Sequence, residues 1–67
     1  MMTSEITRKE RNGFIYEAET YFGKTSVLVL ERRTDGNLYH VTSKVVRTAI
    51  HMAAIETIAT KVEALLS

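Results

Sequence analysis

The sequence predicts an α+β fold in which a three- to four-stranded antiparallel β-meander is followed by one long C-terminal α-helix. Two observations predict it. Up to about residue 42, segments rich in β-branched and aromatic residues are separated by short turn signals, and connections this short join antiparallel strands but not parallel ones. From residue 43 onward the chain has no Gly or Pro and is rich in Ala, Leu and Glu, which is typical of a helix.

Turns that contain glycine define the expected strands. Asn12-Gly13 is a type I′ hairpin signal, because both central residues of that turn need a positive φ. Residues 22–24 and 35–37 each contain a glycine and supply the next two turns. We therefore expect one domain, residues 1–67, with strands at about residues 5–10, 13–21, 25–33 and 37–42.

The helix is expected at about residues 43–66, with Thr42 or Ser43 as its N-cap. On a helical wheel the apolar stripe changes side near Ala53-Ala54, whereas a helix packed on one sheet keeps one stripe. We therefore expect the first half to cover the sheet and the second half to pair with the same helix of another copy. The residues expected in this homodimer interface are Ile55, Ile58, Ala59, Val62, Leu65 and Leu66.

A break near Ala53-Ala54, which would let the second half fold back as a separate short helix, stays open as an alternative. The expected sheet gives a second indication of a partner. Residues 27–30 are all apolar, as in strands that are covered on both faces. One helix covers only one face of a sheet, so we expect apolar surface to remain for a partner.

Length and composition exclude several classes of protein. A chain of 67 residues forms one small core, and without Cys it has neither a disulfide framework nor a thiolate zinc site. The net charge of +1 is too small for long-range steering toward nucleic acid. No apolar run approaches the ~20 residues of a membrane span, and the N-terminus lacks an apolar signal-peptide core. We therefore expect a cytoplasmic protein without a membrane partner.

The candidate catalytic groups have no partners in the sequence pattern. His40 and His51 are the two histidines, and neither has a carboxylate placed to orient it. Residues 18–25 match the loose phosphate-loop pattern, but they lead into an expected strand rather than into the helix that such a loop requires. We therefore expect no enzymatic activity, no cofactor and no metal site.

Exposed apolar surface and a net charge near zero favour a small non-enzymatic protein-binding module that acts as a homo-oligomer. The expected role is that of an inhibitor or adaptor of a host protein, of the kind that phages and other mobile elements encode. Aromatic and arginine side chains dominate the energetics of such interfaces. The residues expected to contact the unidentified target protein are Tyr16, Tyr21, Arg32, Arg33 and Tyr39.

Nucleic-acid binding is the alternative function. The candidates for phosphate contacts are the basic clusters at residues 8–11, 32–33 and 44–47. A sheet of three strands backed by a C-terminal helix, over residues 13–60, resembles in outline the arm-type DNA-binding domains of phage integrases and the plant ethylene-response factors, which implies a sheet laid in the major groove. Those sheets are rich in Arg and Trp, whereas the expected sheet here is rich in Ile, Val and Leu. Protein binding is therefore the first expectation.

Overall fold

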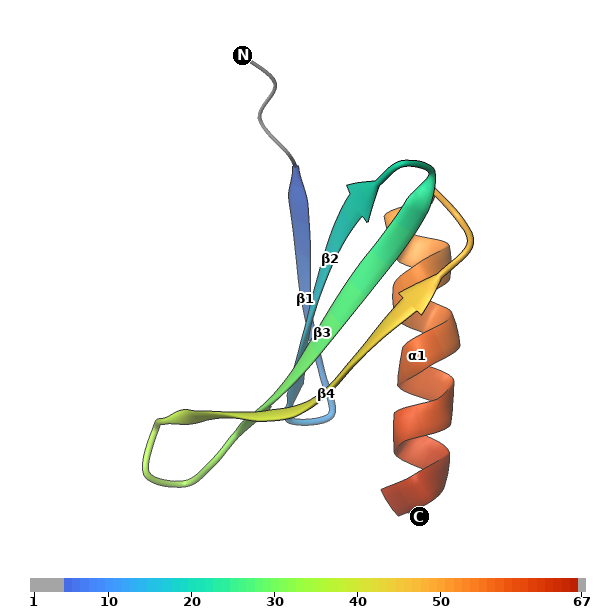
Figure 1. The fold of residues 1–67 in the computed structure, drawn as a ribbon. Helices are drawn as coiled ribbons and strands as arrows, with labels where there is room; N and C mark the ends of the chain where they lie inside the picture. Colours follow the sequence, from blue (N-terminus) through green and yellow to red (C-terminus); the bar gives the residue numbers. More distant parts are fainter. Residues whose placement is uncertain (1–4, 67) are drawn as a thin grey trace.

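Four strands and one helix build the structure, a computed structural model that describes residues 5–66 (Figure 1). The elements are β1 (Ile6–Arg11), β2 (Phe14–Tyr21), β3 (Lys24–Arg32), β4 (Leu38–Val46) and α1 (His51–Leu66). Each strand pairs antiparallel with its neighbour in the sequence, so the sheet order is β1-β2-β3-β4. The predicted antiparallel meander followed by one C-terminal helix is confirmed.

Two tight turns join the first three strands. Asn12 and Gly13 have φ values of 52° and 82°, as the predicted type I′ turn requires. Phe22 and Gly23 have φ values of 49° and 77°, so β2 and β3 are joined in a similar way. A bulky residue rarely adopts this left-handed conformation, and the Phe22 side chain is fully exposed, at 103%.

The boundary between the last strand and the helix differs from the prediction. The sequence predicts a strand that ends near residue 42 and a helix that follows at once, but β4 continues to Val46 and α1 begins at His51. Thr42 and Ser43 are therefore strand residues and not helix caps. The reason is tertiary pairing, because β3 extends its ladder along the whole of this segment and β-branched Val45 and Val46 fit a strand well.

The helix has 16 residues and one continuous apolar stripe. The predicted helical wheel shows the apolar stripe changing side because it includes residues 43–46. These residues belong to β4 and not to the helix. The alternative of a break at Ala53-Ala54 is also wrong, since α1 passes through these residues without interruption. The stripe packs against β2 and β3 of the same chain.

Most of the predicted homodimer interface is wrong, because its residues form the core of the single chain. These core residues of α1 are Ile55, Ile58, Ala59 and Val62, which lie with Ala54 under the sheet. The sheet completes the core with Tyr16, Ala18, Val27 and Val29. Leu65 is 86% exposed near the end of α1, and the side chain of Leu66 lies outside the described part of the chain.

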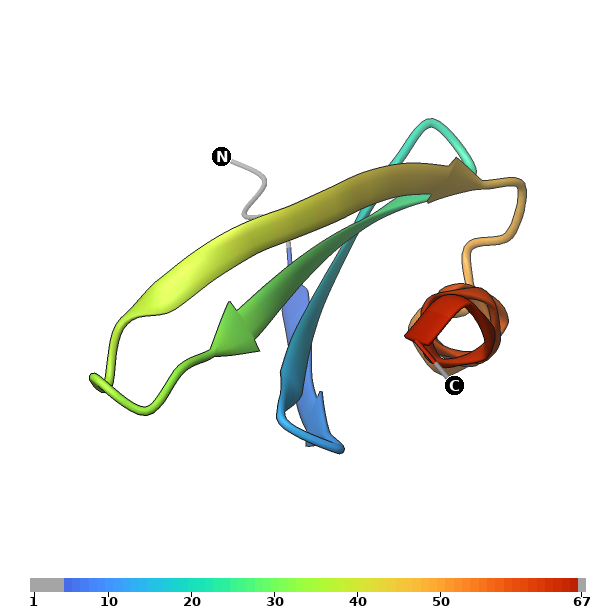
Figure 2. The ribbon, with the colours of Figure 1, turned by 90° about the horizontal axis from the view of Figure 1, so that it is seen from below.

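The opposite face of the sheet carries no helix in the part of the chain that the structure describes (Figure 2). Side chains alternate along a strand, so Ile15 lies on this face because Tyr16 is in the core. Ile15 is nevertheless buried. Arg32 of β3 and Glu10 of β1 form an ion pair of 3.1 Å across β2 on this face.

A charged clamp ties the β1–β2 turn to the helix. Arg11 forms ion pairs of 2.9 Å with Glu56 and 3.1 Å with Glu63, which lie two turns apart on one face of α1. The side chain of Asn12 also donates a hydrogen bond to Glu63. The clamp holds the helix near the β1 side of the sheet.

Candidate functional site: a groove between β4 and α1

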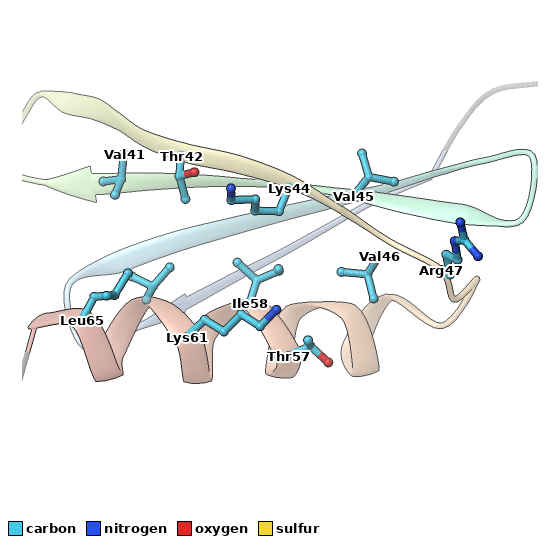
Figure 3. Close-up of a pocket in the computed structure, with 11 residues that line it drawn as sticks. Val41, Thr42, Lys44, Val45, Val46, Arg47, Thr57, Ile58, Lys61 and Leu65 are labelled. Atoms are coloured by element: carbon cyan, nitrogen blue, oxygen red, sulfur yellow. The ribbon is translucent and has the colours of Figure 1, made fainter.

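The helix lies off-centre on the sheet and leaves a groove along β4. It packs on β2 and β3, and the clamp of Arg11 together with a hydrogen bond between Thr7 and His51 links it to β1. The groove that opens between β4 and α1 has a volume of about 710 Å³ (Figure 3). Its lining residues are Val41, Thr42, Lys44, Val45, Val46, Arg47, Thr57, Ile58, Lys61, Val62 and Leu65.

The floor of this groove is apolar. Val46 projects from β4 toward α1, and Ile58 projects from α1 toward the sheet (Figure 3). Val62, one turn further along the helix, is buried, and Leu65 stands exposed where the groove opens. A concave apolar surface of this kind gains free energy when it removes apolar side chains of a ligand from water.

The rim of the groove is cationic. Lys44 and Arg47 come from the end of β4 and the residue after it, and Lys61 comes from α1. The lining contains no Asp or Glu. Within residues 5–66 none of the three cations forms an ion pair, in contrast to Arg11 and Arg32. The groove therefore presents uncompensated positive charge beside an apolar floor.

The groove follows the outer edge of β4. Neighbouring strand residues point to opposite faces, yet Val41 and Thr42 both line the groove, as do Val45 and Val46. A surface that collects residues from both faces runs along the strand edge between them. In the described sheet β4 has a neighbour on one side only, so its outer N–H and C=O groups have no strand partner.

A second polar arrangement lies at the start of α1, where His51 is linked to a chain of threonines. Its Nδ1 lies 2.6 Å from Thr7 Oγ1, and its Nε2 lies 2.6 Å from Thr20 Oγ1. Thr20 Oγ1 is 3.1 Å from Thr25 Oγ1, which donates to the Thr48 carbonyl at 2.5 Å. This chain joins three strands, the β4–α1 connection and the helix.

These hydrogen bonds determine which nitrogen of His51 carries a proton. A carbonyl only accepts, so Thr25 donates to Thr48 and accepts from Thr20. Thr20 has then used its proton and accepts from Nε2–H of His51. In the neutral ring, Nδ1 accepts from Thr7. Both ring nitrogens are engaged, which supports a structural role for this histidine.

The predicted partner-binding residues do not form one surface. Tyr16 is wrong as a contact residue, because it is 0% exposed in the core beneath α1. Arg32 is on the sheet, paired with Glu10. Tyr21 is exposed at the end of β2, where its hydroxyl donates to Glu19.

Arg33 and Tyr39 do lie together, beside the β3–β4 turn, which projects away from α1 (Figure 2). The guanidinium carbon of Arg33 is 4.0 Å from the centre of the Tyr39 ring, and Arg33 also pairs with Glu31. Asp35 accepts hydrogen bonds from the Asn37 backbone and the Tyr39 hydroxyl, and these lower the pKa of its carboxyl. The local bonds order the turn and already engage its charged groups.

Sequence reasoning missed the groove because it misplaced two of its cations. Lys44 and Arg47 form one of the basic clusters noted in the sequence, but the expected helix would have carried them on a face opposite its apolar stripe. In the structure they stand at the end of β4, next to apolar side chains. The local signal that could have found the strand is the pair Val45-Val46, which favours β-structure.

The described fold defines a class: a small α+β domain made of a four-stranded antiparallel meander and one helix. Comparison with protein-family models, curated proteins and solved structures found no match. Over residues 5–66, no helix has the length and apolar character needed to cross a membrane. The same residues contain no group of three or more His, Cys, Asp or Glu side chains that could hold a metal ion.

Proposed function

We propose that the chain is a small non-enzymatic protein-binding module that takes an apolar segment of a target protein into the α1–β4 groove. The observation that carries this proposal is the groove itself, in which Val41, Val45 and Leu65 leave apolar surface exposed beside a floor of Val46, Ile58 and Val62. Open apolar surface of this kind marks interaction sites on small domains. We further propose the role of an inhibitor or adaptor in the cytoplasm, as small phage proteins have.

The ion pairs of the arginines favour protein binding over nucleic-acid binding. Arg11, Arg32 and Arg33 belong to the basic clusters that the sequence offers to phosphates, and each is already paired with a carboxylate of this chain. A phosphate would have to displace those carboxylates. Lys44, Arg47 and Lys61, which form no ion pair within residues 5–66, border an apolar groove, where a phosphodiester backbone leaves the floor unfilled.

The test is a selection of random peptides displayed on particles against the full chain, followed by fluorescence anisotropy with the enriched peptides. Two variants introduce a carboxylate at exposed residues of the groove lining, Val45→Glu in β4 and Leu65→Glu in α1. Ile6→Glu in β1 and Met52→Glu in α1 are matched controls at exposed apolar positions outside the lining.

We expect enriched peptides to lose at least ten-fold in affinity, about 1.4 kcal/mol, with each groove variant and less than two-fold with the controls. Equal binding to groove and control variants would show that the groove is not the binding site. Failure to enrich any peptide against the folded chain would also overturn the proposal.

A further inference from the structure

We propose that the occupant of the groove is an extended segment of a target protein that adds to β4 as a fifth strand and directs both apolar and acidic side chains toward α1. This inference rests on the proposed function of the groove and specifies its ligand. Three features carry it: the free edge of β4, the apolar floor beneath that edge, and the unpaired cations of the rim.

The edge of β4 is the open edge of the described sheet. The other edge strand, β1, has six residues, four of them the consecutive charges of residues 8–11, and such charges discourage strand addition. β4 has nine residues, of which Lys44 is the one Lys, Arg, Asp or Glu. The register irregularity at Val29/Leu30 disturbs the ladder near Val41, and pairing is regular from Thr42 to Val46. An added strand therefore finds a regular edge beside the groove.

The groove suits a strand in length and in chemistry. Its β4 side runs from Val41 to Arg47, a distance of roughly 20 Å for an extended segment. A strand lying there turns every second side chain toward α1, where Ile58 and Leu65 offer apolar contacts and Lys61 offers a cation. Main-chain hydrogen bonds supply affinity in this mode and the alternate side chains supply specificity.

Charge complementarity favours an acidic partner over a second copy of this chain. A second copy would add its own β4, which contains Lys44 and no carboxylate, so the cations of both grooves would stay unpaired. An acidic side chain placed between Lys44 and Lys61 meets two cations that have no ion-pair partner among the described residues. Opposite charges brought together in a partly desolvated groove strengthen binding and fix register.

The experiment uses a fluorescein-labelled nine-residue peptide with threonine at alternate positions and valine and glutamate in turn between them. A second peptide replaces each glutamate with lysine. We expect the glutamate peptide to bind the full chain at least ten-fold more tightly than the lysine peptide. The charge-reversed variant Lys61→Glu is expected to abolish this preference, and Lys9→Glu, outside the groove lining, to leave it unchanged.

Strand addition is tested with two N-methylated forms of the glutamate peptide. In an extended strand the N–H groups of alternate residues point to opposite edges. Methylation of one alternate set therefore blocks pairing with β4 and methylation of the other set leaves it intact. We expect one form to lose at least ten-fold in affinity and the other less than three-fold, and hydrogen exchange of β4 amides to slow when the unmethylated peptide binds.

Each result that differs from these expectations overturns a specific part of the proposal. Equal binding of both methylated forms would overturn strand addition, and equal binding of the glutamate and lysine peptides would overturn the acidic preference. If display-selected peptides occupy the groove while the glutamate peptide does not bind, this inference falls and the proposed function stands. Displacement of the peptide by random duplex DNA, or a doubled mass in light scattering that Val45→Glu abolishes, would assign the groove to nucleic acid or to a second copy instead.

Discussion

Phe22 holds a conformation that its side chain disfavours. A left-handed backbone costs a non-glycine residue roughly 1–2 kcal/mol, and the side chain recovers nothing by burial because it is fully exposed. The equivalent position in the β1–β2 turn is Asn12, a residue type that tolerates this conformation. A strained and exposed aromatic side chain at a turn is a feature that stability alone does not explain.

Exchange of these two turn residues should move stability in opposite directions. We expect Phe22→Asn to raise the free energy of unfolding by about 0.5–1 kcal/mol, because asparagine relieves the strain. Asn12→Phe should lower it by about 1 kcal/mol or more, since Asn12 also donates a hydrogen bond to Glu63. Urea unfolding followed by circular dichroism measures both. An unchanged midpoint for Phe22→Asn would show that the turn stores no strain.

Tyr16 combines a buried aromatic ring with a buried hydroxyl that has no hydrogen-bond partner among the described residues. Burial raises the pKa of this hydroxyl, the nearby charge of Glu63 raises it further, and Arg11 offsets part of the effect. An unpartnered buried hydroxyl costs about 1–3 kcal/mol relative to a solvated one. Tyr16 therefore contributes to stability through its ring and not through its oxygen.

Removal of the oxygen should not destabilise the fold. We expect Tyr16→Phe to leave the free energy of unfolding unchanged or to raise it by up to about 1 kcal/mol. Because the folded pKa of Tyr16 is raised, the stability contributed by its neutral hydroxyl is fully present below the ordinary pKa of 10.0. It is lost as the pH rises through the folded pKa. The parent should therefore lose stability more steeply than Tyr16→Phe above pH 10.0. Parallel melting curves in the two proteins at high pH would contradict this assignment.

At the scale of elements, α1 divides into buried and exposed apolar positions that look alike in the sequence. Ile58 and Leu65 both belong to the apolar set of the second half of the predicted helix, but only Ile58 is in the core. We expect Ile58→Val to lower the free energy of unfolding by about 1 kcal/mol. Leu65→Ala should change it by less than about 0.5 kcal/mol. Chemical unfolding of both variants measures the difference, and a larger loss for Leu65→Ala would place that residue in an interface.

The meander could be predicted from the sequence because its signals are local. Asn12-Gly13 requires positive φ values whatever surrounds it, and the apolar segment of residues 27–30 reads as a strand without knowledge of its neighbours. The β4–α1 boundary could not be predicted in this way. Residues 43–46 become strand because β3 pairs with them, and a wheel drawn through them creates a change of stripe that the helix does not have.

The groove was beyond sequence reasoning for a different physical reason. Its existence depends on where α1 lies across the sheet, and that position is set by side chains far from it in the sequence. Arg11 pairs with the helix from the end of β1, and Thr7 bonds to His51 from the same strand. Neither contact has a periodic pattern, so the uncovered flank at β4 becomes visible only in three dimensions.

At the scale of the whole molecule, the cations differ in whether a carboxylate of the same chain pairs with them. A net charge of +1 conceals two populations of cations. The arginines Arg11, Arg32 and Arg33 are paired with carboxylates of the same chain. Those beside the groove, Lys44 and Lys61, have no such pair in the described structure. Lys44 and Lys61 can therefore pair with acidic side chains of a partner at short range, although the small net charge gives only weak long-range attraction.

The strand order β1-β2-β3-β4 has a consequence for how the chain reaches its native state. Each strand pairs only with the strand next to it in sequence, so every hairpin closes a short loop and little chain entropy is lost before contacts form. The sequence also contains no Pro, which removes prolyl isomerisation as a slow step. Stopped-flow refolding should therefore show a single exponential phase, complete well before the tens of seconds that a proline-limited phase requires.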